Sequence, residues 1–151
     1  MKTKTILAFL LLVIMGCGQH KNDQDKLKKL PFSLLFQGNL MAIDNESKEI
    51  VTITSQKHFE GWIKSLNFNE KEQLLAKKVD FSKYQILVVF DVIRYYFPSS
   101  INVVEIHKYE NYILVQTKSE LKGLAPAINR GFCIIQIPKI TQNITVKKGI
   151  L

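Results

Sequence analysis

Hydrophobic and polar residues follow three successive patterns along the 151-residue chain. Residues 6–15 (ILAFLLLVIM) form an unbroken apolar run, whereas residues 18–29 are polar and charged without any periodicity. From residue 30 onward, short apolar and β-branched runs alternate with turn-forming residues, and one segment has the spacing of a helix. We therefore expect a signal peptide over residues 1–16, a flexible tether over residues 17–29 and one folded domain over residues 30–151.

The segment with helical spacing covers residues 56–66. Its apolar side chains recur at positions i, i+3, i+4 and i+7, which are Phe59, Trp62, Ile63 and Leu66. This spacing predicts an amphipathic helix that packs its apolar face, including Trp62, on the core, and Ser55 stands where an N-cap residue is needed. Asn69 and Glu72 have the spacing of a capping box and predict a second, short helix.

The remaining runs predict β-strands. Residues 84–90 (YQILVVF) are almost continuously apolar, as expected for a central strand that is covered on both faces. Residues 101–107 and 112–117 flank a four-residue turn and predict a hairpin. Further strands are expected over residues 36–43, 49–54, 132–137 and 144–146. These elements predict an α+β fold with a single hydrophobic core, in which one principal amphipathic helix packs on a largely antiparallel β-sheet.

The N-terminal apolar run has the features of a secretory signal. Lys2 and Lys4 precede it, and its ten residues are too few for the roughly twenty that a transmembrane helix needs. The Gly16-Cys17 junction that follows resembles the lipobox of bacterial lipoproteins, in which the cysteine sulfur is acylated and the peptide is cleaved before it. The resemblance implies a membrane anchor on Cys17 and a location in the cell envelope, facing the periplasm or the exterior. An ordinary signal peptide followed by a chance cysteine is the alternative.

Composition narrows the classes of partner. Apolar residues make up 46% of the chain and charged residues 23%, as in ordinary globular proteins, and two cysteines are too few for a disulfide-stapled scaffold. The formal net charge of +8 comes mostly from lysine, and Arg94 and Arg130 are the two arginines. A nucleic-acid-binding protein typically uses more arginine, so we expect no nucleic-acid partner. Lys26, Lys28 and Lys29 lie near the proposed anchor, where lysines can contact anionic headgroups; a solvated basic face is the alternative interpretation.

No residue pattern in the chain is typical of catalysis, metal binding or cofactor binding. The three histidines stand far apart at positions 20, 58 and 107, and neither Gly-x-Ser-x-Gly nor Gly-x-Gly-x-x-Gly occurs. Cys133 shares a strand face with Ile135 and Ile137, which predicts a buried, unreactive thiol. Asp80 and Asp91 flank the central strand, but Asp80 is better suited to starting a turn. We expect no catalytic residue, no metal and no cofactor.

The segment that most resembles an interaction surface is Arg94-Tyr95-Tyr96-Phe97-Pro98, because arginine and aromatic residues are enriched in protein interfaces. If the segment is extended, Tyr95 and Phe97 point into the core while Arg94 and Tyr96 point outward together. Arg94 and Tyr96 are therefore the candidate partner-binding residues. A purely structural role for the aromatic residues is the competing interpretation, and residues 121–130 are the alternative surface.

The order of these motifs resembles the PrcB C-terminal domain family of bacterial envelope proteins. Three stretches carry the resemblance: residues 55–62 (SQKHFEGW), residues 79–83 (VDFSK) with the strand that follows, and residues 133–139 (CIIQIPK). The chain departs from the family's pattern after the central strand, where Pro98-Ser99-Ser100 replaces a glycine pair. The namesake of the family is the lipoprotein partner of a surface protease complex.

The resemblance implies an α+β domain with an accessory, non-catalytic role. It favours a lipoprotein that binds or stabilises a partner protein, with a protease complex as one candidate partner. Two alternatives from other classes remain open. One is a free-standing module that binds a ligand or inhibits a protease, and the other is an uncharacterised envelope hydrolase acting through Asp80, Asp91 or His58.

Overall fold

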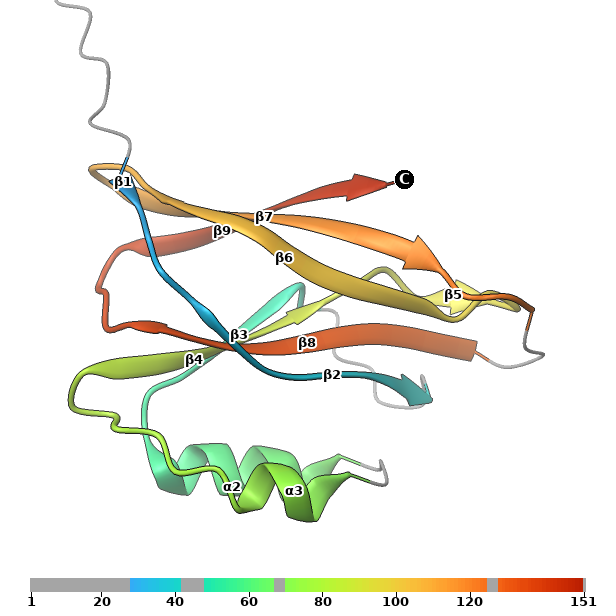
Figure 1. Cartoon of the computed structure of the whole chain (residues 1–151), viewed down its shortest axis with the longest axis horizontal. Coiled ribbons are helices and arrows are strands. Elements are labelled where there is room, and N and C mark those ends of the chain that lie inside the picture. Colours follow the sequence, from blue (N-terminus) through green and yellow to red (C-terminus); the bar gives the residue numbers. More distant parts are fainter. Residues whose placement is uncertain (1–27, 42–47, 67–69, 125–127, 151) are drawn as a thin grey trace, which may run out of the picture.

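The computed structural model describes residues 28–41, 48–66, 70–124 and 128–150. The expectations for the signal peptide, for Cys17, for Lys26 and for Asn69 fall outside these ranges. The described part of the chain is mostly β-sheet, with 56% of it in strands and two short helices. Figure 1 shows three layers, which are an outer sheet, a central sheet and a pair of helices against the other face of the central sheet.

The central sheet has the strand order β2-β8-β4-β3, and every neighbouring pair in it is antiparallel. Its strands are β2 (Ser33–Met41), β3 (Ile50–Ile53), β4 (Tyr84–Phe90) and β8 (Ile128–Pro138). A two-residue strand, β5 (Arg94–Tyr95), pairs with the beginning of β8. Strand β4 has the bounds expected from its apolar run and lies inside the sheet, as predicted for a strand covered on both faces.

The outer sheet has the strand order β1-β6-β7-β9. Its strands are β1 (Lys28–Lys29), β6 (Ser99–Lys108), β7 (Tyr112–Leu121) and β9 (Asn143–Ile150). Strands β6 and β7 form the predicted antiparallel hairpin, whereas β9 runs parallel to β7. Parallel pairing follows from the route of the chain, which leaves β8 in the central sheet and crosses to the outer sheet before β9 begins.

The described residues form two hydrophobic clusters, so the prediction of a single core is wrong. In β4, Ile86, Val88 and Phe90 face the helices, while Leu87 and Val89 face the outer sheet. Strand β8 alternates in the same way. Successive side chains on a strand point to opposite faces, so two inner strands with apolar residues on both faces create a hydrophobic layer on each side. The one sheet expected from the sequence is in fact two.

The principal helix is confirmed. Helix α2 (Gln56–Ser65) begins after Ser55, whose hydroxyl oxygen accepts a hydrogen bond from the His58 backbone N–H at 3.3 Å. Its buried residues are those of the predicted stripe, Phe59, Trp62 and Ile63. Helix α3 (Lys71–Leu75) packs through Leu74, and Glu70 caps it without a side-chain hydrogen bond.

Candidate functional site

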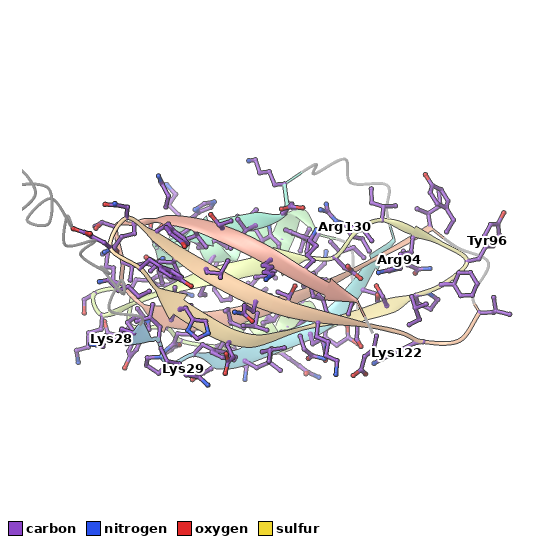
Figure 2. The ribbon with its side chains drawn as sticks, turned by 90° about the horizontal axis from the view of Figure 1, so that it is seen from above. Lys28, Lys29, Arg94, Tyr96, Lys122 and Arg130 are labelled. Carbon is purple, nitrogen blue, oxygen red and sulfur yellow. The ribbon has the colours of Figure 1, made fainter. Side chains whose placement is uncertain are left out.

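Large apolar side chains gather at one end of the sandwich. Six of them, with exposed fractions between 43% and 79%, come from three segments: Tyr95, Tyr96, Phe97, Leu121, Leu124 and Ile128. We refer to these six residues as the hydrophobic tip. Figure 2 shows Tyr96 and Lys122 at this end and Lys28 and Lys29 at the opposite one. Monomeric proteins rarely expose so many adjacent apolar side chains without a binding function.

Backbone pairing brings the three segments of the tip together. Tyr95 lies opposite Ile128 where β5 pairs with β8, and Ser99 lies opposite Leu121 at the open end of the β6–β7 hairpin. The Lys122 N–H donates to the carbonyl oxygen of Pro98 at 2.7 Å. The tip therefore belongs to both sheets and is held by main-chain hydrogen bonds.

The predicted alternation of the Arg94–Pro98 segment is wrong. Tyr95 and Phe97 are exposed rather than buried, and Tyr96 is exposed as expected. The physical reason is the backbone of Tyr96, whose φ of 69° lies in the left-handed region, so that the chain is not extended there. An aromatic residue in that region is strained, and such strain concentrates at functional sites.

Arg94 turns inward instead of outward. Its Nε atom lies 3.3 Å from Oδ2 of Asp91, and its side chain is 18% exposed. Asp91 is buried at the end of β4, and its carboxylate accepts a hydrogen bond from the Ser99 hydroxyl at 2.6 Å. Arg94 and Ser99 thus connect the beginning and the end of the loop that carries Tyr96.

The environment of Asp91 favours its charged form. Burial is the largest single influence and raises the pKa of the Asp91 carboxyl group, whereas hydrogen bonds from the Ser99 hydroxyl, the Val92 N–H and the Ser119 hydroxyl lower it. With the charge of Arg94 added, the pKa of Asp91 lies below its ordinary value. The base of the tip is therefore organised around a buried carboxylate.

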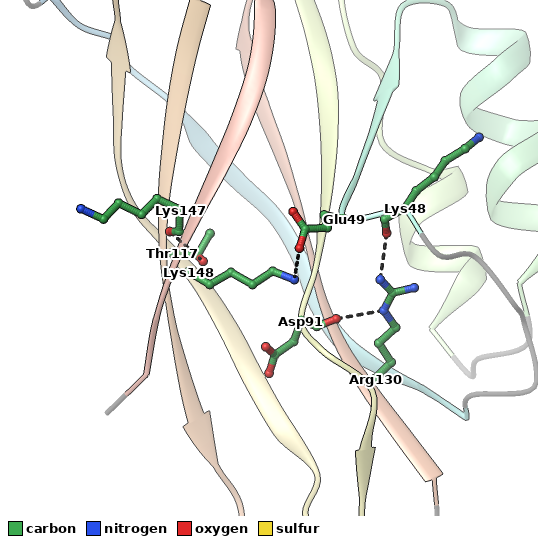
Figure 3. Close-up of polar contacts among 7 residues, drawn as sticks. All are labelled: Lys48, Glu49, Asp91, Thr117, Arg130, Lys147 and Lys148. Carbon is green, nitrogen blue, oxygen red and sulfur yellow. Dashed lines mark hydrogen bonds and ion pairs between the residues drawn. The ribbon is translucent and has the colours of Figure 1, made fainter.

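Arg130 also stabilises the backbone around Asp91, and it does so on the face of the central sheet that the helices cover. Its guanidinium group donates from Nε to the Asp91 carbonyl oxygen at 2.9 Å and from Nη2 to the Lys48 carbonyl oxygen at 2.8 Å (Figure 3). It also lies 4.7 Å from the centre of the Phe90 ring. A charged group that is buried in this way is tolerated because its donors are satisfied. Arg130 joins the end of β4 to the chain before β3.

Gly131 permits a close approach of β8 to the beginning of β6. A Cβ atom at this position would lie 2.5 Å from the Ser99 carbonyl oxygen, which no side chain tolerates. The carbonyl oxygen of Gly131 accepts a hydrogen bond from the Asp91 N–H at 2.8 Å. The glycine therefore lets β6, β8 and the loop after β4 meet directly beneath the tip.

Comparison of the chain with protein-family models, with curated proteins and with solved structures finds no match in any of the three. The site is therefore interpreted from its own geometry.

The residues considered for a hydrolase, Asp80, Asp91 and His58, do not come together, and of these three only Asp91 lies beneath the tip. Asp80 and Asp91 lie beyond opposite ends of the seven-residue strand β4, more than about 20 Å apart, whereas a glycosidase pair lies within about 10 Å. Asp80 accepts a hydrogen bond from the Ser82 N–H and forms the predicted turn. His58 is exposed on α2. Within the described ranges, no group of three metal-binding side chains lies close enough to hold an ion.

Cys133 is buried as predicted. It belongs to the cluster between the two sheets, and burial raises the pKa of its thiol to about 12. A thiol with this pKa stays protonated near neutral pH and is a poor nucleophile.

Of the six tip residues, Tyr96 alone is among the candidates taken from the sequence, which places Tyr95 and Phe97 in the core. The remaining three are Leu121, Leu124 and Ile128. They lie within the alternative surface proposed for residues 121–130. The sequence places them about 25 to 35 positions from Tyr96, and only strand pairing brings them beside it. In the sequence these three residues are isolated aliphatic positions in a loop with glycine and proline. That pattern is too common to identify them as binding residues.

Proposed function

We propose that this protein is a non-catalytic lipoprotein of the cell envelope that binds or stabilises a partner protein through its hydrophobic tip. One observation carries the proposal, namely the six large apolar side chains that three segments expose at one end of the sandwich. Aromatic and aliphatic residues at the centre of a protein interface contribute most of its binding energy. Of the two candidates taken from the sequence, Tyr96 is exposed to a partner, whereas Arg94 lies beneath this surface and binds Asp91.

The lipid anchor is the second part of the proposal. The leader and the Gly16-Cys17 junction support acylation of Cys17 and attachment to a membrane. In the part of the chain that the structure describes, no helix is both long and apolar enough to span a bilayer. An acyl chain contributes roughly 0.8 kcal/mol of membrane binding for each buried CH₂ group.

The kind of partner is proposed from the resemblance to the PrcB C-terminal domain family. The stretches that carry this resemblance lie in helix α2, in the turn before β4 together with β4, and in β8. The partner we propose is a protein of the envelope, such as a protease complex. The stretch Pro98-Ser99-Ser100, which departs from the family's pattern, lies beside the tip, so the partner need not be the one that other members bind.

A capture experiment with matched variants tests the proposal. Tagged, lipidated protein is purified from detergent-solubilised envelopes, either with the double change Tyr96→Asn, Leu124→Ser or with the control Leu34→Ser, Val104→Ser. All four side chains are large and exposed, and the control pair lies outside the tip. Asparagine is chosen at position 96 because it tolerates a positive φ better than most residues do. Arg94 is left intact so that Asp91 is not disturbed.

We expect the tip variant to lose its partner protein while the control variant retains it. Both variants should unfold within a few degrees of the wild type, because surface substitutions change stability little. Equal recovery of the same partner by the two variants would contradict the proposal that the tip is the binding surface.

A further inference from the structure

The end of the sandwich opposite the tip carries the first described residues of the chain. Strand β1 pairs there with the end of β6, so that Lys28 lies opposite Lys108 and Lys29 lies opposite His107. The turn between β6 and β7 and the beginning of β7 lie at the same end (Figures 1 and 2). We refer to Lys28, Lys29, Lys108, Tyr109 and Tyr112 as the tether-end surface.

Two like charges face each other in this surface. Residues that are directly opposite on antiparallel strands have neighbouring side chains, and like charges in such a pair repel each other. Lys29 is neutralised by Glu105, whose Oε1 atom lies 2.8 Å from its Nζ atom. Within the described part of the chain, neither Lys28 nor Lys108 forms an ion pair. An anionic group placed between the two ammonium groups would relieve their repulsion.

A pair of tyrosines stands next to these lysines. The rings of Tyr109 and Tyr112 are stacked, with centroids 4.3 Å apart and an interplanar angle of 9°. The Tyr109 N–H donates to the Tyr112 carbonyl oxygen at 2.9 Å, which fixes the turn. Tyrosine is enriched where proteins meet the headgroup region of a bilayer, because its ring is apolar and its hydroxyl is polar. Each lysine contributes roughly 1 kcal/mol to the binding of a protein to an anionic membrane surface.

The length of the chain before β1 decides which end of the sandwich lies near the membrane. Ten residues lie between Cys17 and Lys28, so the eleven Cα–Cα steps from one to the other span at most about 40 Å. Strand β8, with 11 residues, is about 36 Å long. To place the tip on the same bilayer, the domain would have to invert and the tether would have to be almost fully extended.

We propose that the tether-end surface rests on the anionic headgroups of the bilayer that holds the lipid anchor, and thereby points the hydrophobic tip away from it. The inference rests on the proposed lipid anchor and on no property of the partner. Phosphate groups of the lipid bind between Lys28 and Lys108, and Tyr109 and Tyr112 lie at the level of the headgroups.

Vesicle binding tests the charge requirement. The mature chain, residues 17–151 with Cys17→Ser, is sedimented with phosphatidylcholine vesicles that contain or lack phosphatidylglycerol. We expect binding only to the anionic vesicles, weakened by salt, and lowered about tenfold or more by Lys28→Glu, Lys108→Glu. The matched control is Lys64→Glu, Lys118→Glu, which changes the charge equally at two exposed lysines on α2 and on the middle of the outer sheet. Equal loss in both variants, or no binding at all, would overturn the inference.

A depth measurement tests the orientation with the lipidated protein. An environment-sensitive fluorophore is attached to Asn111→Cys, in the turn beside Tyr112, or to Leu124→Cys in the tip. The native thiol of Cys133 is buried and does not compete for the label. In phosphatidylglycerol vesicles we expect quenching by spin-labelled lipids at position 111 and none at position 124.

The opposite result, with quenching at position 124 alone, would show that the tip enters the bilayer and would overturn the inference. The same result would also contradict the proposal that the tip binds a partner protein. If the protein does not bind anionic vesicles but still captures its partner, the inference about the tether-end surface is overturned while the proposed function stands. The two proposals can therefore fail separately.

Discussion

Asp91 and Tyr96 stand five residues apart in the chain and have opposite environments. Asp91 is 1% exposed, whereas Tyr96 is 62% exposed with a strained backbone. The two are linked because Ser99 and Arg94 bind Asp91 on either side of the loop that carries Tyr96. The buried carboxylate therefore stabilises an exposed, strained conformation that the loop residues would not adopt by themselves.

Replacement of Asp91 should destabilise the domain in a pH-dependent way. We expect Asp91→Asn to lower the free energy of unfolding by about 1–3 kcal/mol at neutral pH, because buried donors lose a charged acceptor. The folded-state pKa of Asp91 is lowered, so its contribution is fully present above the ordinary carboxyl value of 3.8 and is lost as the pH falls through the folded-state pKa.

Urea denaturation at several pH values measures this effect. The difference between wild type and Asp91→Asn should be constant from pH 8 to about pH 5 and should shrink below about pH 4. Asp80→Asn is the matched control, because Asp80 is exposed and forms only a local turn. A difference that persists unchanged into acid would show that the charge of Asp91 does not carry the effect.

At the scale of elements, helix α2 packs on one face of the central sheet. Trp62 lies between the helix and the sheet, with its ring edge-on to Phe90 and to Phe132 at centroid distances of 6.4 Å in both cases. These two phenylalanines come from the neighbouring strands β4 and β8. A single side chain of the helix thus contacts both inner strands.

Truncation of Trp62 should be costly for the same reason. We expect Trp62→Ala to lower the free energy of unfolding by about 3–5 kcal/mol, because it removes a large buried ring and leaves a cavity. Circular dichroism follows the unfolding, since Trp62 is the only tryptophan of the chain. His58→Ala, on the exposed face of the same helix, should change little. A cost below about 1 kcal/mol for Trp62→Ala would place the ring outside the core.

At the scale of the whole molecule, the sandwich has two chemically different ends. One end bears the hydrophobic tip, and the other bears lysines and stacked tyrosines next to the beginning of β1. The strands run between the two ends, so the distance between them is set by strand length. In the proposed arrangement, the rigid sandwich acts as a spacer that presents the tip to a partner away from the membrane.

The anchor itself makes a prediction for the whole chain. In cells grown with an alkyne fatty acid, the wild-type protein should be labelled and should sediment with membranes, because in our proposal an acyl group on Cys17 is the anchor. Cys17→Ser should abolish the label and release the protein from the membrane fraction. Cys133→Ser is the control and should leave the labelling unchanged. Equal labelling of Cys17→Ser and wild type would contradict the proposal that Cys17 is acylated.

Local patterns determined much of the fold. The spacing of Phe59, Trp62 and Ile63, together with Ser55, was enough to predict α2, because helix formation depends on residues three and four positions apart. The apolar run of β4, the β6–β7 hairpin and the buried thiol of Cys133 were also predicted correctly for this reason. Each of these features depends on residues that are near one another in the sequence.

Long-range pairing decided the rest. The sequence could not show that the strands divide between two sheets, that β9 runs parallel to β7, or that Leu124 and Ile128 lie in the same exposed surface as Tyr96. The alternation expected around Tyr96 failed because Arg94 is drawn to Asp91 and the backbone turns to a positive φ. By itself, the sequence determined which segments become strands or a helix and which of their faces are apolar. Only the tertiary structure decided which faces meet, because that choice depends on contacts between residues far apart in the chain.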